Sequence, residues 1–149
     1  MGRGASPDPH RPRLRAALTA FLDTNVLIRH FTGDPPDMAA RATAALAGGD
    51  ELLLADLVVA ECVYVLESFY EVPRERVAEL MRAAIALPSI RTVDPQSLLR
   101  AFEIYEVDGL DFAEAYLVAQ AEATGVNTVL SFDKTIDRVK TVTRREPEP

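Results

Sequence analysis

The stretch AFLDTNVLI, at residues 20–28, predicts a buried strand that passes directly into a helix. The apolar run at residues 20–22 has the length of a strand, and residues 26–28 begin a helical apolar pattern. Asp23 lies between the two, where the carboxyl end of a parallel strand delivers side chains to the edge of a sheet. Asp is also favoured at the start of a helix, so a purely structural role as an N-cap is the alternative for Asp23.

The rest of the chain continues this alternation of strands and helices. Short apolar runs at residues 52–54, 90–93, 128–131 and 139–143 predict further strands, and the longer segments between them have helical periodicity. This order predicts an α/β fold with three layers. A central, mostly parallel sheet of about 4–5 strands would be flanked by helices on both faces.

The length of 149 residues suffices for one domain with a hydrophobic core. We expect a single domain over residues 19–147, preceded by a disordered extension at residues 1–18 that is rich in Pro and Arg. No apolar run is long enough to cross a membrane, and the first residues lack the apolar stretch of a secretory signal. Cys62 is the only cysteine, which excludes an intrachain disulfide and a Cys-based metal site. The expected location is the cytoplasm.

Four carboxylates form the candidate site. Asp23 and Asp133 each follow a predicted strand, and each has a helix N-cap as its structural alternative. Glu61 lies at the edge of a helical apolar stripe that runs from residue 58 to Phe69, so it is expected to face a desolvated region, where a carboxylate must be paired, protonated or bound to a cation. Its structural alternative is an ion pair with an arginine.

Glu114 lies on a predicted helix that is apolar almost all round, which suggests that its carboxylate also points into a desolvated region. Asp111 comes three residues earlier, and this spacing is typical of a capping box at a helix start, the structural alternative for this pair. The net charge of −7 argues mildly against a broad phosphate-binding surface and mildly for divalent cations. Hard cations such as Mg²⁺ or Mn²⁺ prefer carboxylate and water oxygens, so converging acids predict such a site.

Four short motifs carry a resemblance to PIN-domain nucleases. FLDTNVLI at residues 21–28 is similar to the opening motif of that family, and VAE at residues 59–61 is similar to its second acidic motif. LDFAEA at residues 110–115 and SFDK at residues 131–134 resemble the third and the fourth. The similarity runs in order over nearly all of the expected domain. Within the family the chain looks closest to the VapC-type toxins of type II toxin–antitoxin pairs.

The resemblance implies roles for individual residues. Asp23, Glu61, Glu114 and Asp133 would be the catalytic acids and metal ligands. The family most often has Asp where this chain has Glu114, so Asp111 is the alternative third ligand. The supporting residues would be Thr24, Asn25, Asp111 and Ser131, as hydroxyl or polar groups around the acids.

The implied activity is Mg²⁺- or Mn²⁺-dependent hydrolysis of RNA phosphodiesters, leaving a 5′-phosphate and a 3′-hydroxyl. The implied partners are an RNA substrate, a small antitoxin protein and a second copy of the chain in a homodimer. The side chains expected to contact phosphate are Arg29, Arg41, Arg74, Arg76 and Lys134.

Two other interpretations compete with this one. A catalytically weak or silent PIN fold could serve as a binding or assembly module, and the Glu at position 114 is the best support for it. A receiver-like signalling domain also gathers acids and a lysine at strand ends. It would have adjacent acids after the first strand, whereas this chain has only Asp23 there.

Overall fold

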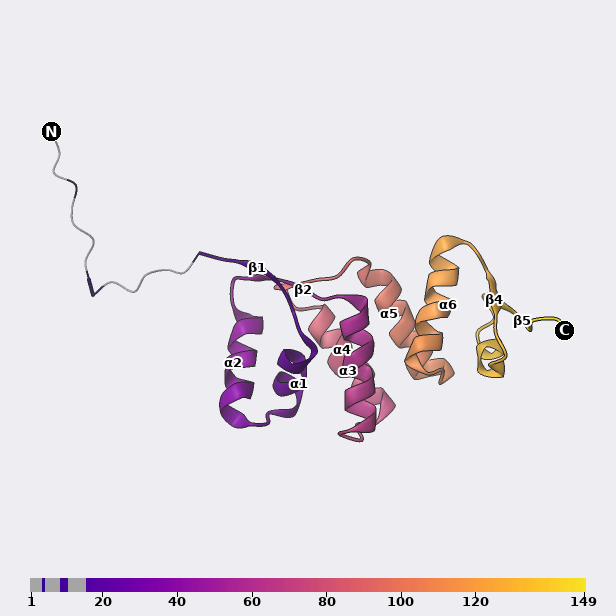
Figure 1. Ribbon diagram of the computed structural model, residues 1–149, viewed down its shortest axis with the longest axis horizontal. Coiled ribbons are helices and arrows are strands. Elements are labelled where there is room, and N and C mark those ends of the chain that lie inside the picture. Colours follow the sequence, from indigo (N-terminus) through magenta and orange to yellow (C-terminus); the bar gives the residue numbers. More distant parts are fainter. Residues whose placement is uncertain (1–3, 5–8, 11–15) are drawn as a thin grey trace.

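The computed structural model describes residues 4, 9–10 and 16–149, and it confirms the predicted α/β class (Figure 1). Most of the expected extension at residues 1–18 lies outside the described residues, so its disorder stays a prediction. Among the residues that are described, no helix is both long enough and apolar enough to span a bilayer.

The amino-terminal part begins with the predicted strand and helix. Asp23 caps the first helix, and Gly33 ends it with a left-handed φ of 70°. A proline then occupies the first turn of the next helix, where its missing N–H costs nothing. The elements are β1 (Thr19–Phe21), α1 (Thr24–Thr32), α2 (Pro36–Ala47), β2 (Glu51–Leu53), α3 (Asp56–Ser68), α4 (Arg74–Ile85) and β3 (Ile90–Arg91).

The carboxy-terminal part has the predicted elements with one shift. The last strand begins at Thr143, later than the predicted strand at residues 139–143, because Val139 and Val142 are buried and anchor a turn instead. The elements are α5 (Pro95–Glu103), the π-helical turn η1 (Ile104–Asp108), α6 (Phe112–Thr124), β4 (Thr128–Leu130), the 3₁₀ turn η2 (Lys134–Arg138) and β5 (Thr143–Arg145).

The strands form two separate parallel sheets instead of the single central sheet that was predicted. One sheet has the order β1-β2-β3, with Ala20 opposite Leu52 and Leu52 opposite Ile90. The other sheet pairs β4 with β5. Helix α6 packs on α5, and β4 follows α6 after three residues, so β4 and β5 lie at the opposite end of the molecule from β1 (Figure 1).

The core lies between the strands and the helices. Helices α1 to α4 lie together on one side of the three-stranded sheet (Figure 1). Tyr105, Phe102 and Phe112 form an aromatic cluster that joins α5, η1 and α6, with the Phe102 and Phe112 ring centroids 4.8 Å apart. On β1 the side chain of Phe21 is 78% exposed, whereas that of Leu22 is buried. Among the described residues, the outer face of this sheet is therefore open at Phe21.

Candidate active site

Asp23 stands at the carboxyl end of β1 and begins α1. Its Oδ1 accepts a hydrogen bond of 2.9 Å from the main-chain N–H of Thr24, so the carboxylate caps the helix. The side chain of Asp23 is exposed. The cap therefore holds Asp23 in place without removing it from solvent.

Thr24 joins this carboxylate to a second one on α3. The buried hydroxyl of Thr24 donates a hydrogen bond of 2.8 Å to Glu61 Oε2. Glu61 is exposed, which corrects the expectation that it faces a desolvated region. The structural alternative for Glu61 was an ion pair with an arginine, and in the described part of the chain Glu61 makes none. Its partner is the hydroxyl of Thr24 instead.

The two carboxylates line a cavity of about 350 Å³, which we call the acid cavity; its lining is Asp23, Thr24, Asn25, Ile28, Arg29, Glu61, Val65, Phe69 and Tyr70. Phe69 was expected on the apolar stripe of α3, yet it lies just past the helix end and is 78% exposed. Its ring packs edge-on against that of Tyr70, with centroids 5.0 Å apart. The acid cavity therefore combines carboxylates with an exposed aromatic wall.

The negative charge of this cavity acts on the neighbouring thiol. Burial raises the pKa of Cys62 from 9.0 to about 12, and the charges of Glu61 and Asp23 add to the shift. The thiol is therefore protonated at neutral pH. Cys62 behaves as a small buried apolar residue beneath the acids.

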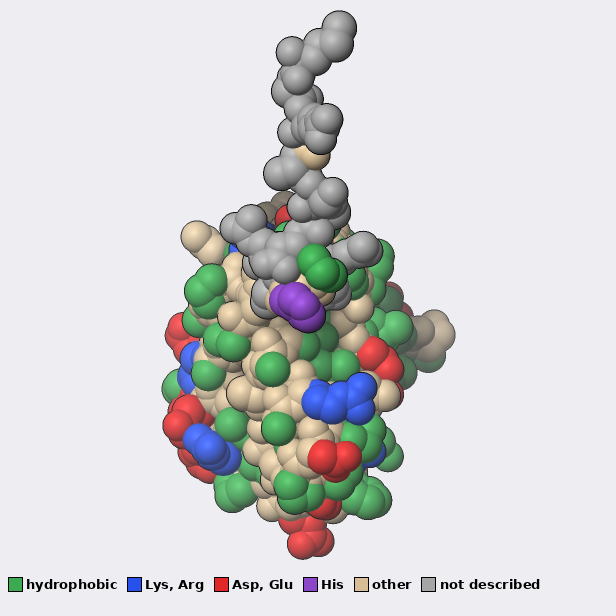
Figure 2. All heavy atoms as spheres, turned by 90° about the vertical axis from the view of Figure 1, so that its left-hand side faces the viewer, with side chains coloured by type: hydrophobic (Ala, Val, Ile, Leu, Met, Phe, Trp, Pro, Cys, Tyr) green, Lys and Arg blue, Asp and Glu red, His purple; other side chains and the backbone are tan. Residues whose placement is uncertain are grey.

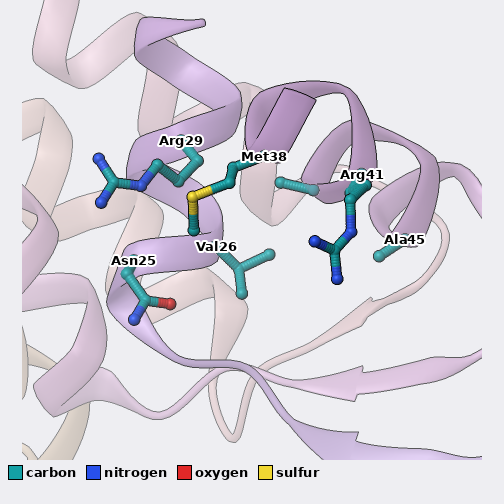
Figure 3. A pocket seen from close by; sticks show the side chains of 7 residues that line it. Asn25, Val26, Arg29, Met38, Arg41 and Ala45 are labelled. Atoms are coloured by element: carbon teal, nitrogen blue, oxygen red, sulfur yellow. The ribbon is translucent and has the colours of Figure 1, made fainter. Parts of the chain in front are cut away.

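A second cavity, of about 270 Å³, adjoins the first between α1 and α2 and shares Asn25 and Arg29 with it. Figure 3 shows Val26 and Met38 between the arginines at positions 29 and 41. The buried Nε of Arg29 has no hydrogen-bond partner among the described residues. A donor of this kind is suited to an anionic ligand.

Two other predicted phosphate contacts are occupied within the fold. Arg74 donates a hydrogen bond of 2.9 Å to the carbonyl of Tyr105 and another to the carbonyl of Leu110. Its guanidinium also lies 4.2 Å from the Tyr105 ring centroid. Arg76 pairs with Glu79 at 2.8 Å. Arg29 therefore remains the basic group that lines the acid cavity, and Arg41 lines the adjoining one, while Lys134 opens η2 in another part of the molecule.

The third predicted acid lies on a different part of the fold. Glu114 is partly buried in the first turn of α6. Asp111 does not cap this helix with its side chain; it is exposed and lies 3.7 Å from Arg74 Nη2. Asp111 therefore does not form the capping box that was the structural alternative for this pair, and its carboxylate pairs with Arg74 instead.

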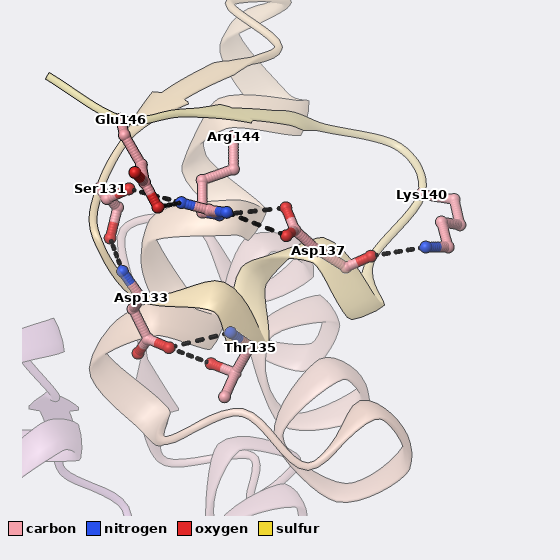
Figure 4. A network of polar contacts seen from close by, with 7 residues as sticks. All are labelled: Ser131, Asp133, Thr135, Asp137, Lys140, Arg144 and Glu146. Carbon is pink, nitrogen blue, oxygen red and sulfur yellow. Dashed lines mark hydrogen bonds and ion pairs between the residues drawn. The ribbon is translucent and has the colours of Figure 1, made fainter. Parts of the chain in front are cut away.

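The fourth acid is held by its own turn (Figure 4). Asp133 Oδ1 accepts hydrogen bonds from the N–H and the hydroxyl of Thr135, at 2.9 and 2.7 Å, and these bonds lower the pKa of Asp133. The Ser131 hydroxyl accepts from the N–H of Asp133 at 2.9 Å, so it shapes the turn. Nearby, Arg144 pairs with Asp137.

The four acids are thus divided into two pairs. Asp23 and Glu61 share the acid cavity, whereas Glu114 and Asp133 lie with α6 and the β4–β5 sheet. Within residues 4, 9–10 and 16–149, no three carboxylate, imidazole or thiol side chains gather closely enough to hold a metal ion. The division follows from the two separate sheets, because each sheet brings its own strand end to a different place.

The donor set of the acid cavity fits a hard divalent cation. In the described structure, one oxygen of each carboxylate bonds to Thr24, and the other oxygens, Asp23 Oδ2 and Glu61 Oε1, make no hydrogen bond or ion pair. Exposed carboxylate oxygens are the ligands that Mg²⁺ and Mn²⁺ prefer. Sequence reasoning missed Phe69 and Tyr70 as part of this site; the available signal was two adjacent aromatic residues at the end of the predicted helix.

Comparison with known proteins gives one match. No curated protein matches the sequence. The sequence profile of the PIN domain family matches residues 20–142, a span that runs from β1 to the turn before β5 and contains all four acids. Since this span covers most of the chain, the protein belongs to the PIN domain family.

Proposed function

We propose that this protein is a divalent-metal-dependent endoribonuclease. PIN domains are generally nucleases that use divalent metal ions. The observation that carries the proposal is the pair of exposed carboxylates, Asp23 and Glu61, held together by the Thr24 hydroxyl in the acid cavity. This pair lies at the carboxyl end of a parallel strand, where open α/β sheets place their sites.

Asp23 and Glu61 would hold Mg²⁺ or Mn²⁺. Glu114 and Asp133, with Asp111 as the alternative to Glu114, lie apart from this pair and would act as further ligands only where they are brought beside the acid cavity. A bound ion of this kind makes its water easier to deprotonate and neutralises charge on a phosphodiester. The role of Thr24 is positional, because its main chain and its hydroxyl orient both carboxylates at once. Orientation by outer groups of this kind commonly changes metal affinity or activity by roughly 10–100-fold.

The neighbouring side chains favour a single-stranded nucleic acid. Phe69 offers an exposed ring on which a base can stack, as in proteins that bind single strands, and the partly buried Tyr70 lies beside it. Arg29 supplies positive charge beside the acids, Arg41 supplies it in the adjoining cavity, and Asn25 adds a polar group shared by both cavities. Figure 2 shows Lys and Arg as isolated groups on the α2 end of the molecule. Among the described residues, this end therefore has no broad basic face for duplex binding.

The test is cleavage of a structured RNA that carries single-stranded loops, with Mn²⁺ and with a chelator. We expect cleavage only with the ion, and ends with a 5′-phosphate and a 3′-hydroxyl. Asp23→Asn should lower the rate by roughly 100-fold or more, since it removes a proposed metal ligand while keeping the helix-capping oxygen. Asp37→Asn is the matched control, because Asp37 is an exposed acid in the first turn of α2.

Binding of Mn²⁺, measured by calorimetry, gives a second readout. Wild type and Asp37→Asn should bind the ion alike, and Asp23→Asn should bind it more weakly. If wild type and Asp23→Asn both fail to cleave, with and without the ion, the enzyme proposal is overturned. The alternative, a silent PIN fold that acts as a binding module, would then stand.

We further propose that the protein is the VapC-type toxin of a toxin–antitoxin pair in the cytoplasm. The support is the acid cavity itself, since a basic side chain of a small partner could reach Asp23 and Glu61 and block the site. Expression of wild type should arrest growth, and Asp23→Asn should not. Co-expression of the protein encoded by the adjacent open reading frame should relieve the arrest; unimpaired growth with active wild-type enzyme would contradict the toxin role.

A further inference from the structure

The free edge of β1 is the first of two unpaired strand edges. The carbonyl of Leu18 and the N–H of Leu22 bond to β2. In a parallel ladder the main-chain groups alternate between neighbours, so those of Thr19 and Phe21 point away from β2. Since β1 ends the order β1-β2-β3, these groups lie along an edge that no other described strand pairs with.

The free edge of β4 is the second. The carbonyl of Asn127 and the N–H of Ser131 bond to β5. By the same alternation, the main-chain groups of Thr128 and Leu130 point away from β5. Among the described residues β4 pairs with β5 alone, so this edge is open too.

Each sheet also lacks a cover on one face. Phe21 is 78% exposed, Leu130 is 68% exposed, and Phe132, just beyond β4, is 71% exposed. Parallel sheets are found almost only with both faces covered, and an open edge with apolar side chains is a template for another strand. These two sheets therefore lack the same two things, an edge partner and a covering layer.

The two edges complement each other. If the two free edges pair in parallel, the alternation of main-chain hydrogen bonds places Phe21 opposite Val129 or Ser131. The opposed side chains then lie on the same face of the joined sheet. Val129 is buried, and β4 contacts α6. Pairing would therefore place α6 over Phe21 and its neighbours, and would turn Leu130 toward the side of Leu22, which is covered by α1 and α3.

The chain cannot make this pairing with itself while α6 stays in place. Residues 125–127 are the only connection between α6 and β4, and three residues span at most about 11 Å. Helix α6 is packed on α5, and the Tyr116 hydroxyl ties it to Asp56 Oδ2 at 2.6 Å. Figure 1 shows the β4–β5 sheet beyond α6, on the side away from β1. The partner for each edge is then another copy of the same chain.

We propose that β4 of one copy pairs in parallel with β1 of a second copy, and that the exchange is reciprocal. Each composite sheet would have the order β3-β2-β1-β4-β5, with the last two strands from the other chain. Reciprocal exchange of an identical element is a common route to a closed dimer.

The exchange would also complete the site, and this part rests on the proposed function. Helix α6 and β4 run in opposite directions after a short connection, so Glu114 at the start of α6 and Asp133 after β4 lie at the same end of this unit. Arg138 ties that end together through hydrogen bonds to the carbonyls of Asp108 and Gly109, at 3.3 and 3.4 Å. Parallel pairing brings this end to the carboxyl end of β1, beside the partner copy's acid cavity.

The test is chemical cross-linking of a Thr19→Cys/Asn127→Cys double variant. Both positions are exposed and lie at the amino-terminal ends of the two edges, and Cys62 is buried with a raised pKa, so it adds little background. With a short bis-maleimide in dilute solution, exchange predicts a covalent dimer on a denaturing gel. Thr19→Cys/Val107→Cys is the control, since Val107 is 74% exposed but lies on η1, and it should give no covalent dimer above the background of the single variants.

A cross-linked monomer would show closure within one chain and would overturn the proposal. Cross-linking no greater than the control would also overturn it, because the edges would then be unpaired. A cross-linked dimer without nuclease activity would leave the exchange standing and remove the proposed function instead.

Complementation tests the composite site. Asp23→Asn and Glu114→Gln, refolded together, should recover about one quarter of the wild-type activity, because half of the dimers are mixed and each has one intact site. Recovery of no activity from the mixture, with wild type active after the same refolding, would contradict a site shared between copies.

Discussion

Thr24 and Glu61 lie 37 positions apart in the sequence, and the hydroxyl of the first fixes the carboxylate of the second at 2.8 Å. The same threonine bonds to Asp23 through its main-chain N–H. One small buried residue thus sets the separation of two acids that belong to different elements. This relationship makes Thr24 a positioning residue, and it can be tested apart from the acids.

Thr24→Val keeps the shape of the side chain and removes the hydroxyl, so Glu61 loses its partner. We expect RNA cleavage and Mn²⁺ affinity to fall by roughly 10–100-fold, with stability lowered by only about 1 kcal/mol. Thr32→Val is the control, since its hydroxyl bonds to the Ile28 carbonyl at the far end of the same helix. Equal activity of the two variants would show that the link to Glu61 has no part in the site.

Arg29 and Arg41 are expected to contact phosphate. Replacing either by Gln should weaken binding of a single-stranded RNA and reduce the slope of log K against log salt by about 1. The measurement is a salt titration of binding without divalent ion. Arg91→Gln, an exposed arginine on β3, should leave the slope unchanged. A slope that does not change for Arg29→Gln and Arg41→Gln would place the phosphates elsewhere.

Arg74 is expected to matter for stability and Arg76 to matter little. Arg74 joins α4 to η1 and to the start of α6 through carbonyls and the Tyr105 ring, and charged hydrogen bonds of this kind contribute about 1.5–3 kcal/mol each. Arg76 has an exposed partner on its own helix, worth about 0–1 kcal/mol. Urea denaturation of Arg74→Ala and Arg76→Ala should separate them; equal midpoints would contradict the structural role of Arg74.

Cys62 should make the protein less stable at high pH. Its pKa rises from 9.0 to about 12 on folding, so between these values the unfolded chain loses a proton that the folded chain keeps. The free energy of unfolding should then fall with rising pH, by up to about 1.4 kcal/mol per pH unit from this group. Below pH 9 the group contributes no pH dependence.

The check is the pH dependence of urea denaturation for Cys62→Ala, with Val63→Ala as a control. Both substitutions shorten a buried side chain on α3, but only Cys62→Ala removes a titrating group. We therefore expect a shallower decline above pH 9 for Cys62→Ala alone. The same decline in both variants would mean that other groups, such as Tyr116 with its pKa raised to about 12 by its hydrogen bond to Asp56, govern this range.

Local signals in the sequence predicted most of the elements. The run at residues 20–28 gave β1 and α1 because an apolar triplet, a capping Asp and a helical pattern all act over a few residues. The structural alternative for Asp23, a helix cap, was recognised for the same reason and is present in the structure. The position of β5 was missed, since Val139 and Val142 are apolar but serve a turn.

Long-range arrangement was predicted less well. Periodicity placed Glu61 at the edge of an apolar stripe, but it could not show that the Thr24 hydroxyl, 37 residues away, would hold it at the surface. The capping-box pattern at Asp111 and Glu114 was outweighed by Arg74, which lies on another helix. The division of the strands into two sheets depends on how α6 packs, and no local pattern encodes that.

The open edges of β1 and β4 have a consequence for dosage. If each complete site needs two chains, the number of sites grows with the square of the chain concentration when the protein is dilute. The total activity would then fall faster than in proportion to the amount of protein, and a cell could carry a low level of the chain without harm. A strand edge left unpaired in one copy would in this way set how much of the protein a cell tolerates.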